Sequence, residues 1–285
     1  MLTIGTWRCF LKITQYLSGA LGVLFNFVLI LLIIFRSPNH LGAYKFLMIY
    51  ISVFEITYSI LDGLTEAHVF SYGPAFLLLR YFKHSIIGRK EGFYLLVTYC
   101  GTFGLSLALF GVHFIYRYGA VDTAFRKKYL SGKKLAAMFW IPLVYGVWWS
   151  GVVLFCYGPS QESDEFIRIP LLQGYETRVE DISYAIVWFY APNKLTNQLE
   201  PVWLTFIGIA CLWFMSSSSF FCVMYFGIKC YRKITKALKN SKMSSHYARS
   251  IQQQLFQALV MQVDAETRKP TQRGQWLGKC RAEVD

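Results

Sequence analysis

Long apolar runs alternate with short polar segments along this chain of 285 residues. Five runs are long enough to cross a bilayer core, which needs roughly 20 apolar residues in a helix. These expected spans cover residues 17–35, 46–64, 93–116, 135–157 and 202–228. Two other apolar stretches, 69–79 and 182–191, are too short to span. The pattern therefore predicts the all-α class, as a polytopic membrane helix bundle.

The composition agrees with lipid as the solvent of this chain. Hydrophobic residues make up 55% and charged residues 16%, and the mean hydropathy is +0.37. A soluble domain carries about 25% charged residues. The net charge of +13 is therefore assigned to the loops of a membrane protein, and we expect the lipid bilayer, and no nucleic acid, as a partner.

The distribution of Lys and Arg between the loops predicts the orientation. Inner loops of membrane proteins carry more Lys and Arg than outer loops. With the N-terminus outside, the inner segments carry 15 of these residues and the outer segments 9. The inner segments are then 36–45, 117–134 and 229–253, and the outer segments are 1–16, 65–91 and 158–201.

Four polar residues of the second span share one helical face. Ser52, Glu55, Ser59 and Asp62 follow the spacing i, i+3, i+7, i+10. A carboxylate within a bilayer is costly, so Glu55 is expected to face the bundle interior or water. One interpretation is a ligand pocket or a polar switch lined by these four residues. The other is that Glu55 only fixes packing, through a hydrogen bond to a neighbouring helix.

A stripe of small residues in the third span predicts close helix packing. Such residues let two helix backbones approach each other. The stripe consists of Gly101, Gly104, Ala108 and Gly111. In the first span, Asn26 is expected to bond to a neighbouring helix and so to assist packing.

Signals of enzymatic chemistry are absent from the sequence. It contains no GxSxG, HExxH, P-loop or GxGxxG motif, and its cysteines and histidines have no metal-ligand spacing. We therefore expect no enzyme, no cofactor and no metal site. A transporter or channel subunit would show paired, broken helices, which the five unequal spans lack. A membrane protein that acts only through helix association is the other alternative.

Several stretches resemble a known receptor family. They cover residues 26–62, 113–121 and 217–262, and the most specific read FLMIYISVFEITYSILD (46–62) and YFGIKCYRKI (225–234). The chain resembles the nematode seven-transmembrane chemoreceptors of the serpentine Str/Srj class. That resemblance implies a G-protein-coupled receptor fold, a small odorant-like ligand between the helices, and a heterotrimeric G protein as partner.

The resemblance also implies a role at the inner end of the third span. Arg117 and Tyr118 match the family's aromatic-Arg-Tyr motif and are expected to face the G protein. The general receptor pattern has an acid before the Arg, and Tyr116 stands there instead. The implied location is the plasma membrane of a sensory cell, of which the sensory cilium is one part.

The C-terminal part departs from the family pattern. Residues 250–262 look like the start of a sixth helix, whereas 263–285 are polar and are expected to be disordered. Relatives continue into a sixth and a seventh helix. We therefore expect a receptor truncated after its fifth helix, and the resemblance leaves open whether this chain signals.

The orientation can be tested by labelling single cysteines in intact cells with an impermeant reagent. Glu165→Cys, in the acidic outer loop, should be labelled, whereas Lys127→Cys should be protected until the membrane is permeabilised. Labelling at position 127 with protection at position 165 would reverse the predicted topology.

Overall fold

The computed structural model describes residues 4–36, 44–82, 87–192 and 198–240. In these residues, five helices are long and apolar enough to cross a membrane. They are α1 (Ile4–Arg36), α2 (Tyr44–Thr65), α3 (Arg89–Val121), α5 (Lys133–Cys156) and α7 (Trp203–Asn240). Their order matches the five expected spans, which confirms the membrane helix bundle. The expectations for 250–262 and 263–285 lie outside the described residues.

The chain divides into two compact units, residues 1–225 and 226–285. Of the second unit, only the end of α7, up to Asn240, is described. The first unit contains all the other described elements, including the short helices α4 (Thr123–Tyr129) and α6 (Gln161–Tyr175). All packing discussed below lies within this first unit.

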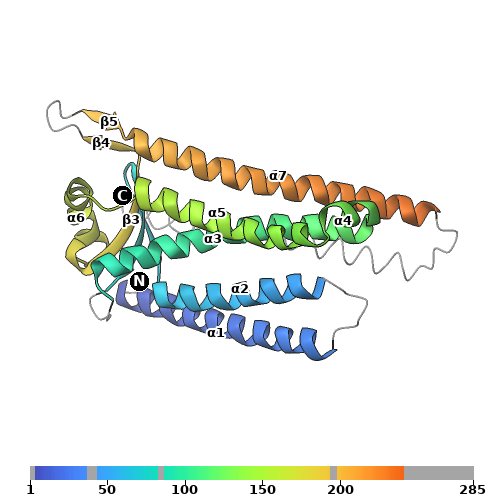
Figure 1. Ribbon diagram of the computed structural model, residues 1–285. Coiled ribbons are helices and arrows are strands. Elements are labelled where there is room, and N and C mark those ends of the chain that lie inside the picture. Colours follow the sequence, from blue (N-terminus) through green and yellow to red (C-terminus); the bar gives the residue numbers. More distant parts are fainter. Residues whose placement is uncertain (1–3, 37–43, 83–86, 193–197, 241–285) are drawn as a thin grey trace. The chain divides into compact units, whose positions relative to one another are not determined.

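Glycines bring α3 and α5 close together, and Figure 1 shows the two helices side by side. A Cβ atom at Gly101 would lie 1.9 Å from Ser150 Oγ and 2.9 Å from the Gly146 carbonyl oxygen. At Gly104 it would lie 2.6 Å from the Cβ atom of Trp149. All three distances are too short for a real Cβ atom, so the interface requires glycine at each position.

The small-residue stripe continues toward α7. Ala108 is 5% exposed, and Gly111 is buried as well. The Cys222 thiol of α7 lies 3.9 Å from the Gly111 carbonyl oxygen. All four stripe residues are therefore buried, but they serve two neighbours. Gly101 and Gly104 contact α5, whereas Gly111 contacts α7.

Helices α1 and α2 also pack through small residues. A Cβ atom at Gly22 would lie 2.7 Å from Ser59 Oγ. Gln15 Nε2 donates to the Asp62 carbonyl oxygen at 2.9 Å and so joins the same two helices. Asn26 differs from the expectation, because its Nδ2 donates to the Gly22 carbonyl oxygen of its own helix at 3.0 Å. That i−4 bond satisfies the amide locally.

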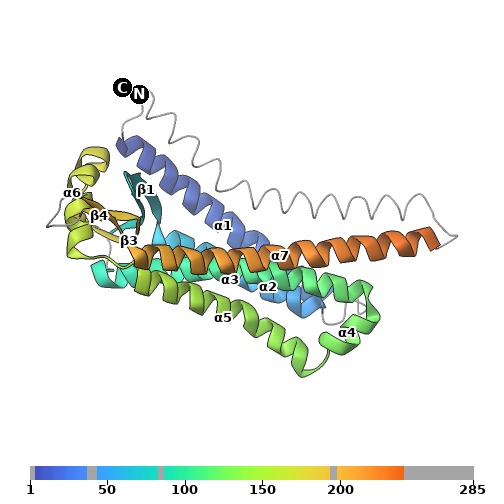
Figure 2. The ribbon, with the colours of Figure 1, turned by 90° about the horizontal axis from the view of Figure 1, so that it is seen from above.

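A small sheet and α6 form a cap at one end of the helices, as Figures 1 and 2 show. The antiparallel sheet has the order β1 (His68–Tyr72), β2 (Ala75–Tyr81), β3 (Ile182–Trp188). Leu77 pairs with Ile186 across β2 and β3. The cap core consists of Ala75, Leu77, Leu79, Ile167, Leu171, Val179, Ile182, Tyr184, Ile186 and Trp188.

The cap adds a small sheet to the predicted helix bundle. The apolar stretch 69–79 forms most of β1 and β2, and the stretch 182–191 contributes β3, which pairs with β2 although about a hundred residues separate them. Buried backbone groups need hydrogen-bond partners, and β2 finds them in β1 on one side and in β3 on the other. A minor pair, β4 (Tyr190–Pro192) and β5 (Leu199–Pro201), completes the strands of the described residues.

The close approach of α3 and α5 predicts opposite effects of two glycine substitutions. Gly104→Ala should destabilise the protein by about 1–3 kcal/mol, because its methyl group overlaps the base of the Trp149 side chain. Gly151→Ala on α5 meets nothing within 4 Å and should be neutral or slightly stabilising, since Ala favours helix. Thermal unfolding in detergent measures both. Equal melting temperatures for the two variants would contradict this account of the interface.

Candidate functional site

The described residues offer three candidate regions: the end of α3 near α4, the polar face of α2, and the base of the cap. At the end of α3, Arg117 Nε donates to His113 Nε2 at 3.0 Å. The Tyr44 hydroxyl also lies 3.2 Å from His113 Nε2. The Arg117 guanidinium can only donate, so Nε2 of His113 must accept. In the neutral imidazole the proton is then on Nδ1, an assignment that follows from this geometry. Arg117 thus has a histidine partner one turn earlier.

Tyr118 has a different role from Arg117. Its hydroxyl donates to Asp122 Oδ2 at 3.0 Å, while Oδ1 of the same carboxylate accepts from the Phe125 backbone N–H at 3.0 Å. Asp122 is the N-cap of α4. Tyr118 therefore ties the end of α3 to the start of α4. Arg117 and Tyr118 are adjacent in sequence, but they belong to separate hydrogen-bond groups.

Tyr116, which stands where the general pattern has an acid, belongs to the hydrophobic core. It is 8% exposed and packs on the Tyr44 ring at a centroid distance of 5.5 Å. Leu47, Val112 and Leu130 are buried in the same cluster. No carboxylate at this position can pair with Arg117. The sequence signal that could have identified its actual partner is the i−4 spacing of His113.

The four polar residues of α2 face different surroundings. Ser52 is 1% exposed, Ser59 lies against Gly22 of α1, and the Asp62 carboxylate is near enough to the Tyr99 hydroxyl of α3 to interact with it electrostatically. The Glu55 side chain is exposed in the described bundle, so its role in a pocket, a switch or packing stays a prediction.

Sequence reasoning missed the aromatic pair beside Asp62. The rings of Tyr58 and Tyr99 stack at a centroid distance of 5.6 Å, and their hydroxyls lie 3.5 Å apart. The two residues are 41 positions apart, so no local spacing could have revealed the contact. Together with Asp62 they form a polar and aromatic group between α2 and α3.

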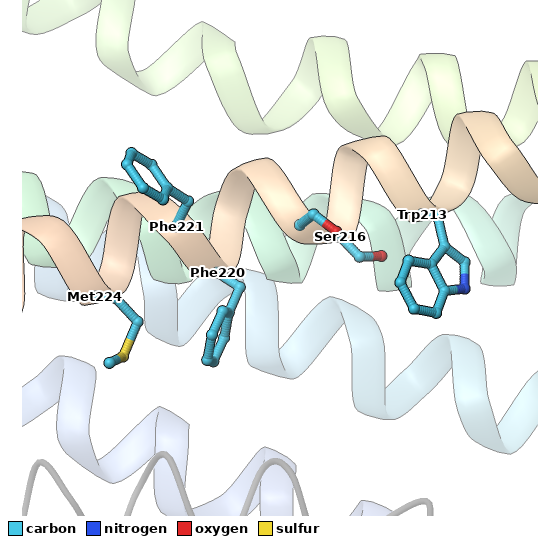
Figure 3. Close-up of a pocket in the computed structure, with 6 residues that line it drawn as sticks. Trp213, Ser216, Phe220, Phe221 and Met224 are labelled. Atoms are coloured by element: carbon cyan, nitrogen blue, oxygen red, sulfur yellow. The ribbon is translucent and has the colours of Figure 1, made fainter.

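Two surface grooves lie in the described part of the chain, and neither is lined by the polar residues of α2. The larger groove, about 550 Å³, is lined by α7 residues only, as Figure 3 shows. They are Trp213, Ser216, Ser217, Phe220, Phe221 and Met224. A second groove of about 370 Å³ lies on the cap, beside Arg168 and Arg178. A groove lined by one helix is an apolar surface and no enclosed pocket, so the predicted ligand pocket stays a prediction.

A polar network fastens the cap to α3. Arg89 Nη2 lies 2.5 Å from Asp164 Oδ1, and the Tyr184 hydroxyl donates to the same oxygen at 2.6 Å. Ser183 Oγ donates to the Arg89 carbonyl oxygen at 2.8 Å. Burial raises the pKa of Tyr184, which keeps the donated proton in place. The network joins α3, α6 and β3, three elements that are distant in sequence.

A second polar group joins α1 to the start of the cap. Lys12 Nζ lies 3.0 Å from Glu66 Oε1, and the Tyr16 hydroxyl donates to the same oxygen. Burial of Glu66 acts to raise its pKa. The hydrogen bonds from Tyr16 and Lys12 outweigh burial and hold this pKa below the ordinary value of 4.5.

These observations define the class first. Five apolar helices with a cap at one end describe a multi-pass membrane helix bundle, whose central helix carries Arg117 at the other end. A family model described as "Serpentine type 7TM GPCR chemoreceptor Str" matches residues 11–265. The chain belongs to this family, which confirms the resemblance seen in the sequence.

Individual relatives agree with the family assignment. "G-protein coupled receptor str-217" of Caenorhabditis elegans is 33% identical over 258 residues, which are 89% of this chain and 72% of the relative. "Serpentine receptor class r-10" of the same organism is 28% identical over 263 residues, covering 90% and 74%. No solved structure matches this chain significantly.

The lowered pKa of Glu66 predicts a pH-dependent contribution to stability. Ionised Glu66 stabilises the fold above pH 4.5, and this contribution disappears as the pH falls through the lower pKa of the folded state. Glu66→Gln should therefore be less stable than the parent chain at pH 7. The loss in the free energy of unfolding should be about 1 kcal/mol or less, because the group is partly exposed. The difference should close at an acidic pH well below 4.5, where Glu66 is protonated in both states.

Thermal unfolding at both pH values measures this difference. The exposed Glu165 of α6 provides a matched control, since Glu165→Gln removes one carboxylate without removing this network. A Glu66→Gln deficit that persists unchanged at the acidic pH would show that the carboxylate charge is not responsible.

Proposed function

We propose that this chain is a chemosensory G-protein-coupled receptor that detects small odorant-like molecules and activates a heterotrimeric G protein. Its proposed location is the plasma membrane, with the N-terminus and the cap outside. Family membership supports this proposal. The observation that carries it is the placement of Arg117 by His113 at the α4 end of α3, away from the cap.

The proposed signalling end is built on α3. Arg117 is only half-buried, and its Nε is fixed by His113, so its charge is held at one position. A G-protein segment that offers a carbonyl or carboxylate group could accept the remaining guanidinium donors. Tyr118 contributes indirectly, because its bond to Asp122 fixes α4 beside Arg117. Both residues are therefore proposed to face or position the G protein.

The proposed ligand region lies on the polar face of α2, at Ser52, Glu55, Ser59 and Asp62. The group of Asp62, Tyr58 and Tyr99 supports it, because it combines a carboxylate, two hydroxyls and two aromatic faces. Small ligands are typically held by apolar and aromatic walls with few polar anchors. This group also touches α3, which carries Arg117, so a ligand here would contact the helix that extends to the other end.

The alternative is a membrane protein that acts through helix association without signalling. The exposed apolar side of α7 favours it, with Trp213, Phe214 and Phe221 each at least 70% exposed. In a membrane such a surface meets either lipid or another helix. A transporter or channel has no comparable support. Helix α2 has two acidic residues, of which Asp62 lies beside Tyr99 and Glu55 is exposed, so they do not form one ion site.

The two candidate functions differ in one measurement, ligand-evoked G-protein dissociation in cells that express the chain. The parent chain should respond to members of a panel of small volatile compounds. Arg117→Gln should lower the response at least tenfold at equal surface expression, since the neutral amide lacks the charge that we assign to coupling. Arg178→Gln, an equal loss of charge on the exposed cap, is the control and should respond normally.

Two outcomes would oppose the receptor proposal. A normal response from Arg117→Gln would remove Arg117 from coupling. A parent chain that reaches the surface but stays silent across the panel, while self-association is detected by energy transfer, would favour the helix-association alternative.

A further inference from the structure

Five cations gather where α4 ends and α5 begins. They are Arg126, Lys127, Lys128, Lys133 and Lys134, and every one of them is exposed. The sequence has no Asp or Glu between Asp122 and Glu162. No carboxylate of the described residues forms an ion pair with these five cations. The cluster is therefore a locally uncompensated positive surface.

A tyrosine organises two of these cations. Lys128 Nζ lies 5.1 Å from the centroid of the Tyr129 ring, and Lys134 Nζ lies 5.8 Å from the same centroid. The Lys134 ammonium also donates to the Lys128 carbonyl oxygen at 3.0 Å. Two like charges lie against one aromatic ring, which attracts each of them but does not remove their mutual repulsion. An anion bound to both ammonium groups would offset that repulsion.

The nearest acid in the sequence is already engaged. Both carboxylate oxygens of Asp122 accept hydrogen bonds, one from Tyr118 and one from the backbone of Phe125. These bonds belong to the α3–α4 junction and hold the carboxylate there. The anion that completes the lysine pair must therefore come from outside the described chain.

The position of the cluster on α5 indicates where that anion comes from. Lys133 and Lys134 begin α5, and Trp140 follows roughly 10 Å along the helix axis. Trp140 is 66% exposed, and Val144 and Val147 beyond it are 58% and 74% exposed. Such a surface is suited to lipid, with tryptophan near the interface. The lysines therefore lie at the depth of the lipid headgroups.

We propose that Lys128 and Lys134, gathered on Tyr129, form a binding site for the phosphate of an anionic lipid headgroup, with Arg126, Lys127 and Lys133 around it. Phosphoinositides fit best, because one headgroup carries several phosphates for several cations. The cytoplasmic leaflet, which holds such lipids, is the one that the proposed receptor orientation gives to this end. The site would anchor the α4 end at the membrane surface beside Arg117.

The test measures lipid binding by the purified full chain in nanodiscs. Both leaflets of a nanodisc are accessible, and no odorant or G protein is present, so the result does not depend on receptor signalling or on cellular topology. A fluorescent phosphatidylinositol bisphosphate in phosphatidylcholine serves as the probe. Lys128→Gln with Lys134→Gln should weaken binding about thirtyfold, since each lysine near an anionic surface contributes a factor of about five.

Matched variants separate the site from general charge. Lys90→Gln with Arg178→Gln removes two exposed cations elsewhere and should bind like the parent chain. Lys128→Arg with Lys134→Arg keeps both charges and should retain most of the affinity. Tyr129→Leu, which keeps all five cations, should bind several times more weakly. This last variant tests the ring itself even if the double glutamine variant proves unstable.

Three results would overturn the proposal. The first is parent-like binding by the double glutamine variant, and the second is an equal loss in the Lys90 and Arg178 control. The third is full displacement of the lipid by an equimolar amount of soluble inositol trisphosphate, which would assign the site to a soluble phosphate.

Discussion

The close packing of α3 on its neighbours is the contact on which the rest of the structure depends. Gly101 and Gly104 let the backbones of α3 and α5 meet, so Trp149 can lie across the gap that missing side chains leave. Lipid offers no hydrophobic drive for helices to associate, and van der Waals contact at small residues supplies it. The same helix then contacts α7 at Gly111 and α2 at Tyr99.

Helix α3 is central, and it connects the cap at one end of the bundle with Arg117 at the other. One end holds the cap through Arg89, which Asp164 and Tyr184 bind on separate elements. The described cysteines form no disulfide, and these hydrogen bonds and charges help to hold the cap on α3. The other end presents Arg117 on His113. A ligand near α2 and a partner at Arg117 would therefore act on the same rigid element.

The sequence predicted the membrane elements well and their contacts only in part. Five apolar runs of sufficient length predict five helices, since each helix satisfies its own backbone in lipid. The spacing of Gly101, Gly104, Ala108 and Gly111 likewise indicates one buried stripe. Asn26 shows where this reasoning fails, because an amide can bond within its own turn as readily as across an interface. For Glu55, periodicity defines a helical face but not which neighbour covers it, so its role stays a prediction.

By itself the sequence determined the membrane class, the order of the spans, the family resemblance and the residues of the aromatic-Arg-Tyr motif. These depend on local composition and on spacing within one helix. Only the tertiary structure decided that 69–79 and 182–191 contribute to one sheet, that His113 partners Arg117, and that Tyr58 meets Tyr99. The physical reason is that hydrogen bonds and ring contacts between distant segments require a fold to bring them together, and no local pattern records the partner.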